Sequence, residues 1–159
     1  MKIPFTGFDT FLLALEEQYK QRGAIGNVCR YVIDLEGKLE KDDVQALLRQ
    51  NTIATTLFNT SFEKAKSLQI PFWIQKESRK IEVQEFDADE LIPSGVKSKT
   101  LDPSEHCLSI DLAHRSSGNS TLIFSWNHML MDGYGAVLFL NQLQKRYGQF
   151  CLRWEQQVL

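Results

Sequence analysis

The sequence predicts an α+β domain built on a largely antiparallel sheet. Residues 107–113 alternate apolar and polar side chains and residues 121–126 are almost continuously apolar, while the Gly- and Asn-containing loop between them is typical of a β-hairpin. Apolar residues recur at spacings of three and four near both ends of the chain, which indicates amphipathic helices, the second one running from the Asp-Gly pair at 132–133 to residue 147. Helices and strands do not alternate strictly, which disfavours a parallel βαβ arrangement, and 159 residues suit a single domain over 1–159.

The first predicted helix begins near Thr6. Asp9 follows Thr6 at the spacing of a helix cap and places an acid close to the positive end of the helix dipole. Residues 27–35 are rich in β-branched and aromatic side chains and predict a strand that ends at Gly37. The helix is expected to bury one apolar stripe formed by Phe5, Phe8, Phe11, Leu12, Leu15 and Tyr19.

The middle of the chain gives a mixed pattern. Asp42 and Asp43 predict the start of a second helix that runs to about Asn51. Residues 52–58 are β-prone and are expected to continue as an extended edge, and a short charged helix is expected over 61–68. Two further strands, 72–75 and 81–86, are predicted to pair as a hairpin across a turn at 77–80, followed by a loop over 87–100.

Charge and cysteine content argue against several classes of protein, including those that bind nucleic acid or a structural metal. Eighteen Lys and Arg against twenty Asp and Glu give a net charge of -2, without the basic excess typical of proteins that bind nucleic acid. Cys29, Cys107 and Cys151 lie too far apart for a CxxC metal site or a disulfide framework, so free thiols and no metal are expected. No apolar run approaches the roughly 20 residues that span a bilayer, and acidic residues interrupt the N-terminal segment; no signal peptide and a cytoplasmic location are therefore predicted.

His128 is the residue whose context most favours chemistry. It follows a buried strand and precedes a turn containing Asp132 and Gly133, so packed backbone can hold it while its ring faces a cavity. Imidazole titrates near neutrality and can take a proton from a hydroxyl, thiol or amine. On these grounds alone a purely structural histidine is the competing interpretation. His106 and His114 are predicted to be solvated, and the sequence has no nucleophile elbow or phosphate-binding glycine motif.

The segment 125–135, SWNHMLMDGYG, resembles the HHxxxDG signature of the thioester-dependent acyltransferase superfamily. This group includes chloramphenicol acetyltransferase, the condensation domains of nonribosomal peptide synthetases, plant acyltransferases and wax-ester synthases. As in that family, a buried strand leads into the motif and an amphipathic helix leaves it. Residues 3–9, 32–39 and 101–103 are similar to other family segments, in the same order. The resemblance implies a chloramphenicol acetyltransferase-like half-domain, equivalent to the N-terminal half of a two-half enzyme.

Roles for the motif residues follow from this resemblance. It implies that His128 is the general base that deprotonates an alcohol or amine as it attacks an acyl thioester. The donor would be acyl-CoA or a phosphopantetheinyl thioester, bound as a substrate rather than as a permanent cofactor. Asp132 would hold the loop through an ion pair, and Gly133 would leave room for the loop and the acyl chain. Trp126 and Asn127 would line the substrate channel.

Two departures from the family keep three hypotheses open. Asn127 stands where the motif has its first histidine, and the chain ends about 26 residues after Gly133, without a second half. The chain is accordingly expected to pair with a C-terminal half, a second subunit or a copy of itself. The first hypothesis is an acyltransferase, and the second is a non-catalytic module that binds an acyl carrier domain or a second half. The third is an α+β domain whose motif is coincidental; the sequence does not specify the acyl donor or acceptor.

Overall fold

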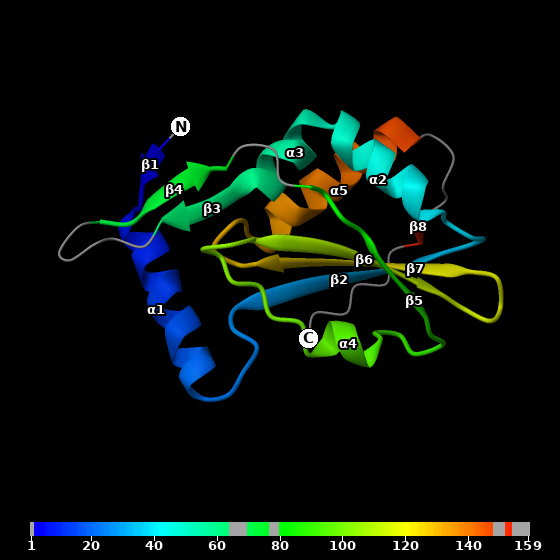
Figure 1. Ribbon diagram of the computed structural model, residues 1–159, viewed down its shortest axis with the longest axis horizontal. Coiled ribbons are helices and arrows are strands. Elements are labelled where there is room, and N and C mark those ends of the chain that lie inside the picture. The colour runs from blue at the N-terminus through cyan, green and yellow to red at the C-terminus, as the bar shows by residue number, and fades with distance from the viewer. Residues whose placement is uncertain (1, 64–69, 77–79, 148–151, 154–159) are drawn as a thin grey trace.

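The computed structural model describes residues 2–63, 70–76, 80–147 and 152–153, and it contains two sheets (Figure 1). The larger sheet has the strand order β5-β6-β7-β2-β8, with β5 parallel to β6 and every other neighbouring pair antiparallel. This arrangement confirms the predicted α+β class with a mainly antiparallel sheet. The strands are β2 (Val28–Leu35), β5 (Gln84–Asp87), β6 (Leu108–His114), β7 (Ser120–Asn127) and β8 (Leu152–Arg153).

The β6–β7 hairpin forms the centre of this sheet, as the sequence predicts. Leu108 pairs with Trp126 and His114 pairs with Ser120, so the two strands match over their whole length. The turn closes through two hydrogen bonds, from the Arg115 amide to the Asn119 carbonyl at 2.9 Å and from the Gly118 amide to the Arg115 carbonyl at 3.0 Å. Gly118 adopts a φ of 84°, which favours glycine. On its other side β7 pairs with all of β2.

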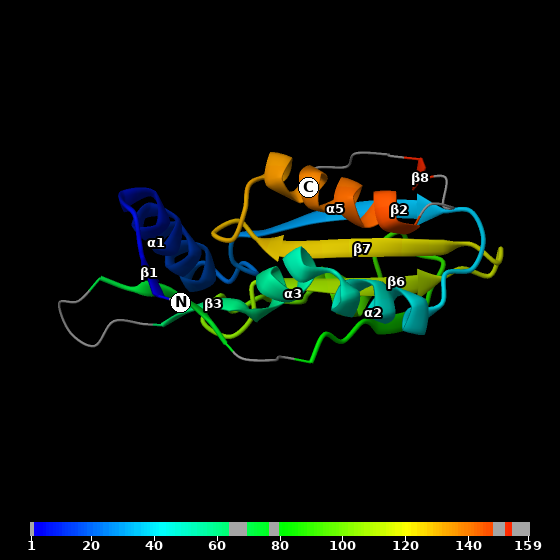
Figure 2. The same cartoon turned by 90° about the horizontal axis from the view of Figure 1, so that it is seen from above.

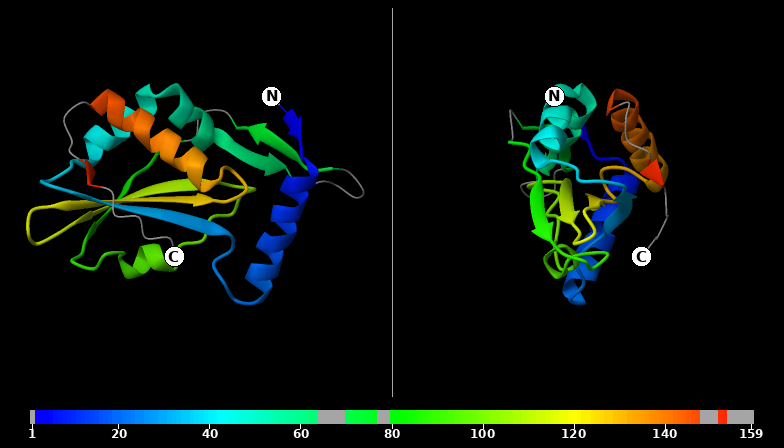
Figure 3. Two further views of the ribbon diagram at one scale, coloured as in Figure 1. Left: turned by 180° about the vertical axis from the view of Figure 1, so that it is seen from behind. Right: turned by 90° about the vertical axis from the view of Figure 1, so that its right-hand side faces the viewer.

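Three helices cover one face of the large sheet, α2 (Lys41–Gln50), α3 (Thr52–Asn59) and α5 (Gly133–Tyr147) (Figure 2). The side chains of alternate strand residues meet those of the helices in one apolar core, because successive strand residues point to opposite faces. The single-turn helix α4 (Ser94–Lys97) covers part of the opposite face, where Val96 packs against Val32 and Ile123 (Figure 3). The main core includes Ile33, Leu48, Ile110, Leu112, Phe124 and Phe139.

A smaller unit lies at the end of the large sheet where β7 finishes (Figure 1). Its sheet has the order β1-β4-β3, formed by β1 (Lys2–Pro4), β4 (Phe72–Gln75) and β3 (Thr60–Glu63). The helix α1 (Gly7–Gln21) packs beside it, and a small apolar core joins Phe5, Leu12, Phe62 and Met129. Because Met129 comes from the loop after β7, this core ties α1 to the motif.

The structure corrects four predictions for the middle of the chain, and the first is the loop expected over 87–100, which contains the helix α4. Residues 52–58 lie in α3 rather than in an extended edge, because the Asn51 side chain accepts hydrogen bonds from the Ile53 and Ala54 amides and caps the helix. Residues 60–63 form β3 instead of the start of a helix, and 64–69 lie outside the described residues. The strand β4 pairs with β1 and β3, whereas β5 joins the large sheet, so the predicted 72–86 hairpin is wrong. Residues 77–79 of its turn are also outside the described residues.

The helix α1 begins as predicted but buries a different stripe. Thr6 and Asp9 form a reciprocal capping box, in which each side chain bonds the other residue's backbone amide. Phe8 and Phe11, expected in the core, are 63% and 57% exposed. The fully buried positions of the helix are Leu12 and, four residues later, Glu16, so the inner stripe carries a carboxylate.

Candidate functional site

The loop 128–132 connects the end of β7 to the start of α5, and its backbone is held from both sides. The indole N–H of Trp126 donates to the Met131 carbonyl at 3.0 Å. The Tyr31 hydroxyl donates to the Gly133 carbonyl at 3.1 Å. A side chain at position 133 would place its Cβ 3.3 Å from that hydroxyl, so glycine permits the close approach. The loop is therefore anchored on two buried aromatic residues.

Asp132 caps the helix α5 rather than forming the predicted ion pair. Its carboxylate accepts a hydrogen bond from the Gly135 amide at 2.7 Å, and its carbonyl accepts one from the Ala136 amide at 3.1 Å. Among the described residues it makes no ion pair, because its side chain turns back onto the first turn of its own helix. An aspartate at this position satisfies orphan amides and suits the positive end of the helix dipole. The cap is what the structure shows, and the structural role predicted for Asp132 in the loop stays a prediction.

His128 is the first residue of this loop, and its backbone is held by a hydrogen bond. Its amide donates to the Asn27 carbonyl at 2.8 Å, which pins the residue to the segment that precedes β2. The side chain is partly exposed, and its Nδ1 is buried without a hydrogen-bond partner among the described residues. Its role as a base stays a prediction.

Asn127 is fully buried and uses both ends of its side-chain amide. Nδ2 donates to Oε2 of Glu16 at 3.1 Å, and Oδ1 accepts from the Met129 amide at 3.0 Å. Its own amide donates to the Cys107 carbonyl at 2.7 Å. Within the described residues the side chain thus faces α1. The channel-lining role predicted for it stays a prediction.

Glu16 is the site residue that the sequence analysis missed. Its side chain is fully buried, and Oε2 accepts hydrogen bonds from the Asn27 amide and the Asn127 side chain. Oε1 lies 3.0 Å from Nζ of Lys20, one turn further along α1. A signal was available: Glu16 follows Leu12 by four residues and so falls on the buried stripe of an amphipathic helix.

Trp126 belongs to the core next to the site. It is 2% exposed and its ring lies 5.0 Å from Tyr31 and 5.2 Å from Phe124, centroid to centroid. Among the described residues it anchors the loop through its indole N–H, and its predicted place in a channel stays a prediction. Of the other histidines, His106 is exposed as expected. His114 is partly exposed, and its Nε2 lies 3.1 Å from Oε1 of Glu85.

Buried charges lie beside the site on the sheet face that carries α4. Nζ of Lys99 is 2.7 Å from Oδ1 of the fully buried Asp111, and Nη2 of Arg30 donates to the Lys99 carbonyl at 2.8 Å. Burial lowers the pKa of the Arg30 guanidinium, although the charge of Asp111 opposes this shift. Burial also raises the pKa of the Cys29 thiol against the opposing charge of Arg30, which disfavours the nucleophilic thiolate.

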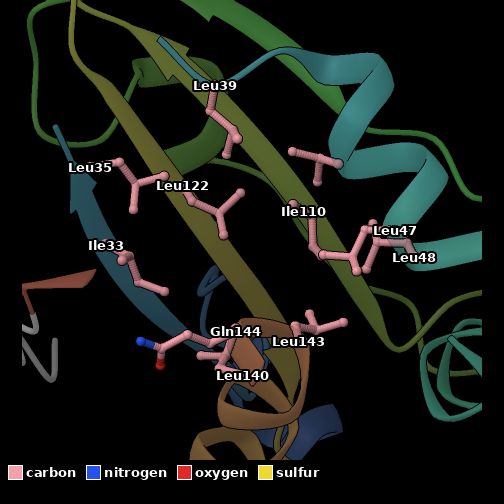
Figure 4. Close-up of a pocket in the computed structure, with 11 residues that line it drawn as sticks. Ile33, Leu35, Leu39, Leu47, Leu48, Ile110, Leu122, Leu140, Leu143 and Gln144 are labelled. Carbon is pink, nitrogen blue, oxygen red and sulfur yellow. The ribbon is translucent and has the colours of Figure 1, made fainter. Parts of the chain in front are cut away.

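An apolar cavity of about 70 Å³ lies elsewhere, between α2, α5 and the sheet (Figure 4). Its walls carry no ionisable side chain, so it offers hydrophobic contact and no proton transfer. His128 therefore remains the better candidate site. Among the described residues, no group of three His, Cys, Asp or Glu side chains is placed to hold a metal ion. The lining residues are Ile33, Leu35, Leu39, Val44, Leu47, Leu48, Ile110, Leu122, Leu140, Leu143 and Gln144.

Comparisons with known proteins identify solved structures that have a similar fold. No protein-family model and no curated protein matches the sequence. The structure is similar to the starter condensation domain of rhizomide synthetase RzmA, with a TM-score of 0.73 and 13% identity over 92% of this chain and 37% of that one. It is also similar to the first condensation domain of the calcium-dependent antibiotic synthetase in complex with a substrate analogue (TM-score 0.69, 14% identity, 94% and 39%). A third similar structure is that of the tallysomycin biosynthesis protein TlmII, with a TM-score of 0.65 and 14% identity over 95% of this chain and 39% of that one.

These likenesses confirm the fold that the motif implied. The chain has the condensation-domain type of α+β fold and spans under two-fifths of the length of these three structures. A mutant of the rhizomide synthetase domain was solved in complex with C8-CoA. Within the described residues, none of the helices has the length and apolar character needed to cross a membrane.

Proposed function

We propose that this chain is the N-terminal half of a thioester-dependent acyltransferase and that His128 is its general base. The observation that carries the proposal is the placement of His128. Its backbone is pinned to the Asn27 carbonyl at the end of β7, its ring is partly exposed, and its Nδ1 has no partner among the described residues. The condensation-domain fold supports this reading of the motif.

The reaction follows from the chemistry of an imidazole beside a thioester. The ring takes the proton from an acceptor hydroxyl or amine as that group bonds to the acyl carbonyl carbon. The tetrahedral intermediate then collapses, the carbon–sulfur bond breaks, and the thiolate takes the proton back from the imidazolium. General-base help of this kind accelerates a reaction by about 10²–10⁴-fold. Asp132, Gly133 and Trp126 keep the loop rigid, which holds the base in reacting geometry.

The remaining parts of the reaction belong outside this chain. Acyl transfer also needs both reactants to be held together and the developing oxyanion to be stabilised. We propose that a C-terminal half, a second subunit or a second copy supplies those groups. The donor is acyl-CoA or an acyl group on the phosphopantetheine arm of a carrier domain. The complex of a similar domain with C8-CoA supports the inclusion of free CoA thioesters.

The test is acyl transfer by the native protein that carries this chain. A panel of acyl-CoA and acyl-phosphopantetheine thioesters is offered with alcohols and amines, and thiol release and product mass are measured. His128→Ala is expected to lower transfer by about 10²–10⁴-fold and leave the circular dichroism spectrum unchanged. His106→Ala, at an exposed histidine outside the loop 128–132, is the matched control and should retain full activity. Equal activity in both variants would refute the proposal.

A non-catalytic module that binds a carrier domain or a second half is the second candidate. Asn127 favours it, because the first position of the motif carries an amide that is fully buried and bonded to Glu16 and Met129. This function predicts that a phosphopantetheinylated carrier binds equally well to the native protein and to His128→Ala, with no turnover in either. Calorimetry of the two proteins separates the candidates.

A further inference from the structure

We infer that Glu16 is a positioning residue for His128, acting from the helix α1 through Asn27 and Asn127. The inference rests on the proposed function for its catalytic consequence, although its geometry stands without it. The three residues Glu16, Asn27 and Asn127 are called the brace below.

The centre of the brace is a buried carboxylate with well-defined partners. Glu16 has no exposed surface, and a single oxygen, Oε2, accepts from both the Asn27 amide and Nδ2 of Asn127. These donors come from segments 100 residues apart in the chain. A buried carboxylate is costly unless its oxygens are hydrogen-bonded or paired with a cation. Oε2 meets the first condition and Oε1 the second: Oε1 has no hydrogen-bond partner among the described residues, but Nζ of Lys20 lies 3.0 Å from it.

The brace meets His128 from two directions. Asn27 donates its amide to Glu16 and accepts the His128 amide on its carbonyl at 2.8 Å, so one peptide segment relays the position of α1 to His128. Asn127, the preceding residue, is bonded to Glu16 on one side and to the Met129 amide on the other. The amides on both sides of the His128 Cα are thereby fixed relative to Glu16.

The segment before β2 is shaped to admit this carboxylate. Gly26 has a φ of 91°, and a Cβ there would lie 2.9 Å from Cδ and Oε2 of Glu16 and still closer to Oε1. Only glycine fits beside the carboxylate without displacing it. The positions of Glu16 and Gly26 are therefore linked, and both serve the same contact with residues 27 and 127.

The consequence for catalysis is one of orientation. A general base must stay within hydrogen-bond reach of its proton, and a misplacement of about 1 Å can cost about 10²-fold in rate. Among the described residues, 127–129 contact α1 through the brace and through the small apolar core that holds Met129 and Leu12. Loss of the carboxylate frees two donors and the peptide that holds His128.

The experiment compares Glu16→Ala with Glu17→Ala, its exposed neighbour on the same helix. Two readouts are taken from the native protein, the hydrogen-exchange rates of the Asn27 and His128 amides by NMR and the steady-state kinetics of acyl transfer. Glu16→Ala is expected to speed exchange at both amides by about tenfold or more and to lower kcat by about 10–100-fold with little change in KM. Glu17→Ala should change neither.

Further variants separate positioning from general loss of stability. Glu16→Gln keeps an oxygen that can accept both hydrogen bonds, so it is expected to restore slow exchange and most of kcat. Gly26→Ala, which displaces the carboxylate without removing it, should behave like Glu16→Ala. Val96→Ala removes a buried methyl pair in the distant cluster under α4 and should lower stability without changing kcat.

The outcomes distinguish this inference from the proposed function. Unchanged exchange at Asn27 and His128 in Glu16→Ala would overturn the brace, whatever the activity. Faster exchange with unchanged kcat, in a protein that His128→Ala inactivates, would overturn the positioning role. If His128→Ala is itself fully active, the proposed function fails, and the exchange rates still decide whether Glu16 holds the loop.

Discussion

Replacement of Gly26 by alanine tests whether the carboxylate of Glu16 is as tightly enclosed as the structure shows. Gly23 provides a matched control three residues earlier. Both glycines have positive φ, 79° at Gly23 and 91° at Gly26, so alanine is strained at either position. A Cβ at Gly23 meets nothing within 4 Å, whereas one at Gly26 meets the Glu16 carboxylate. The difference between the two variants therefore isolates the contact with Glu16.

The surroundings of the two glycines determine how much each alanine variant should lower the free energy of unfolding. Left-handed backbone costs a non-glycine residue roughly 1–2 kcal/mol, and alanine returns about 0.4–1 kcal/mol by restricting the unfolded chain, so Gly23→Ala should cost about 1 kcal/mol. At Gly26 the carboxylate must also move away from two donors, and each unsatisfied buried donor costs about 1–3 kcal/mol. With partial relaxation, Gly26→Ala should lower the free energy of unfolding by about 3–4 kcal/mol. Domains of this size are stable by about 5–15 kcal/mol, so the variant should still fold.

Urea unfolding, followed by circular dichroism and tryptophan fluorescence, gives the free energies for both variants. A double-mutant cycle with Glu16→Ala completes the test. In the Glu16→Ala background the added methyl group meets no carboxylate, so the cost of Gly26→Ala should fall to that of Gly23→Ala. Equal costs for the two glycine variants in the native background, or a Gly26 cost that does not depend on Glu16, would refute the reasoning.

Three smaller predictions concern other parts of the fold. Asn51→Ala removes the cap of α3 and should lower the free energy of unfolding in urea by about 1–2 kcal/mol; no change would contradict the assigned cap. Burial opposes the shift, but hydrogen bonds from Thr6 and Trp73 hold the pKa of Asp9 below its usual range. The folded state then binds fewer protons than the unfolded state, so this stabilisation is complete above about pH 4 and is lost as the pH falls further; Asp9→Asn should flatten the acid limb of a stability–pH curve. Because burial raises the pKa of Cys29, its alkylation by iodoacetamide at pH 8 should be slower than that of a free thiol, as mass spectrometry of the digest would show.

The sequence was sufficient where local pattern and tertiary packing agree. The hairpin 108–127 combines alternation, a glycine turn and a buried second strand, and each of these signals is contained in about 20 residues. The Thr6–Asp9 capping box is likewise local. The same holds for α5, whose apolar spacing predicts a helix.

Prediction failed where a distant partner decides the outcome. The strand β4 has the composition of one arm of a hairpin, but its partners β1 and β3 come from before it in the chain, and β5 finds a parallel partner in β6. Neither pairing has a local signature, since strand register depends on which faces are buried in the whole fold. For residues 52–58 the threonine-rich β propensity was overridden by the single side chain of Asn51, which satisfies two amides at the helix start.

The residues of the candidate site likewise fall into those with a local sequence signal and those that depend on distant partners. His128 could be singled out because its motif is contiguous, and its role as a base stays a prediction. Asp132 caps α5, where the sequence suggested an ion pair. Glu16 was missed because its partners, Asn27 and Asn127, are 11 and 111 residues away. The available signal was the position of Glu16 on the same stripe as Leu12, which predicts a buried carboxylate on the inner face of the helix.

Asn127 and Glu16 are best understood together. A carboxylate accepts hydrogen bonds and donates none when ionised, so the residue facing Oε2 must be a donor at every pH at which Glu16 is charged. An asparagine amide meets this requirement without titrating, and its carbonyl oxygen is left to accept from Met129. A histidine at the same position would change its donors with pH near neutrality. The amide at position 127 therefore donates to Oε2 of Glu16 without any change in its own protonation, so the proposed brace depends on a donor that does not titrate.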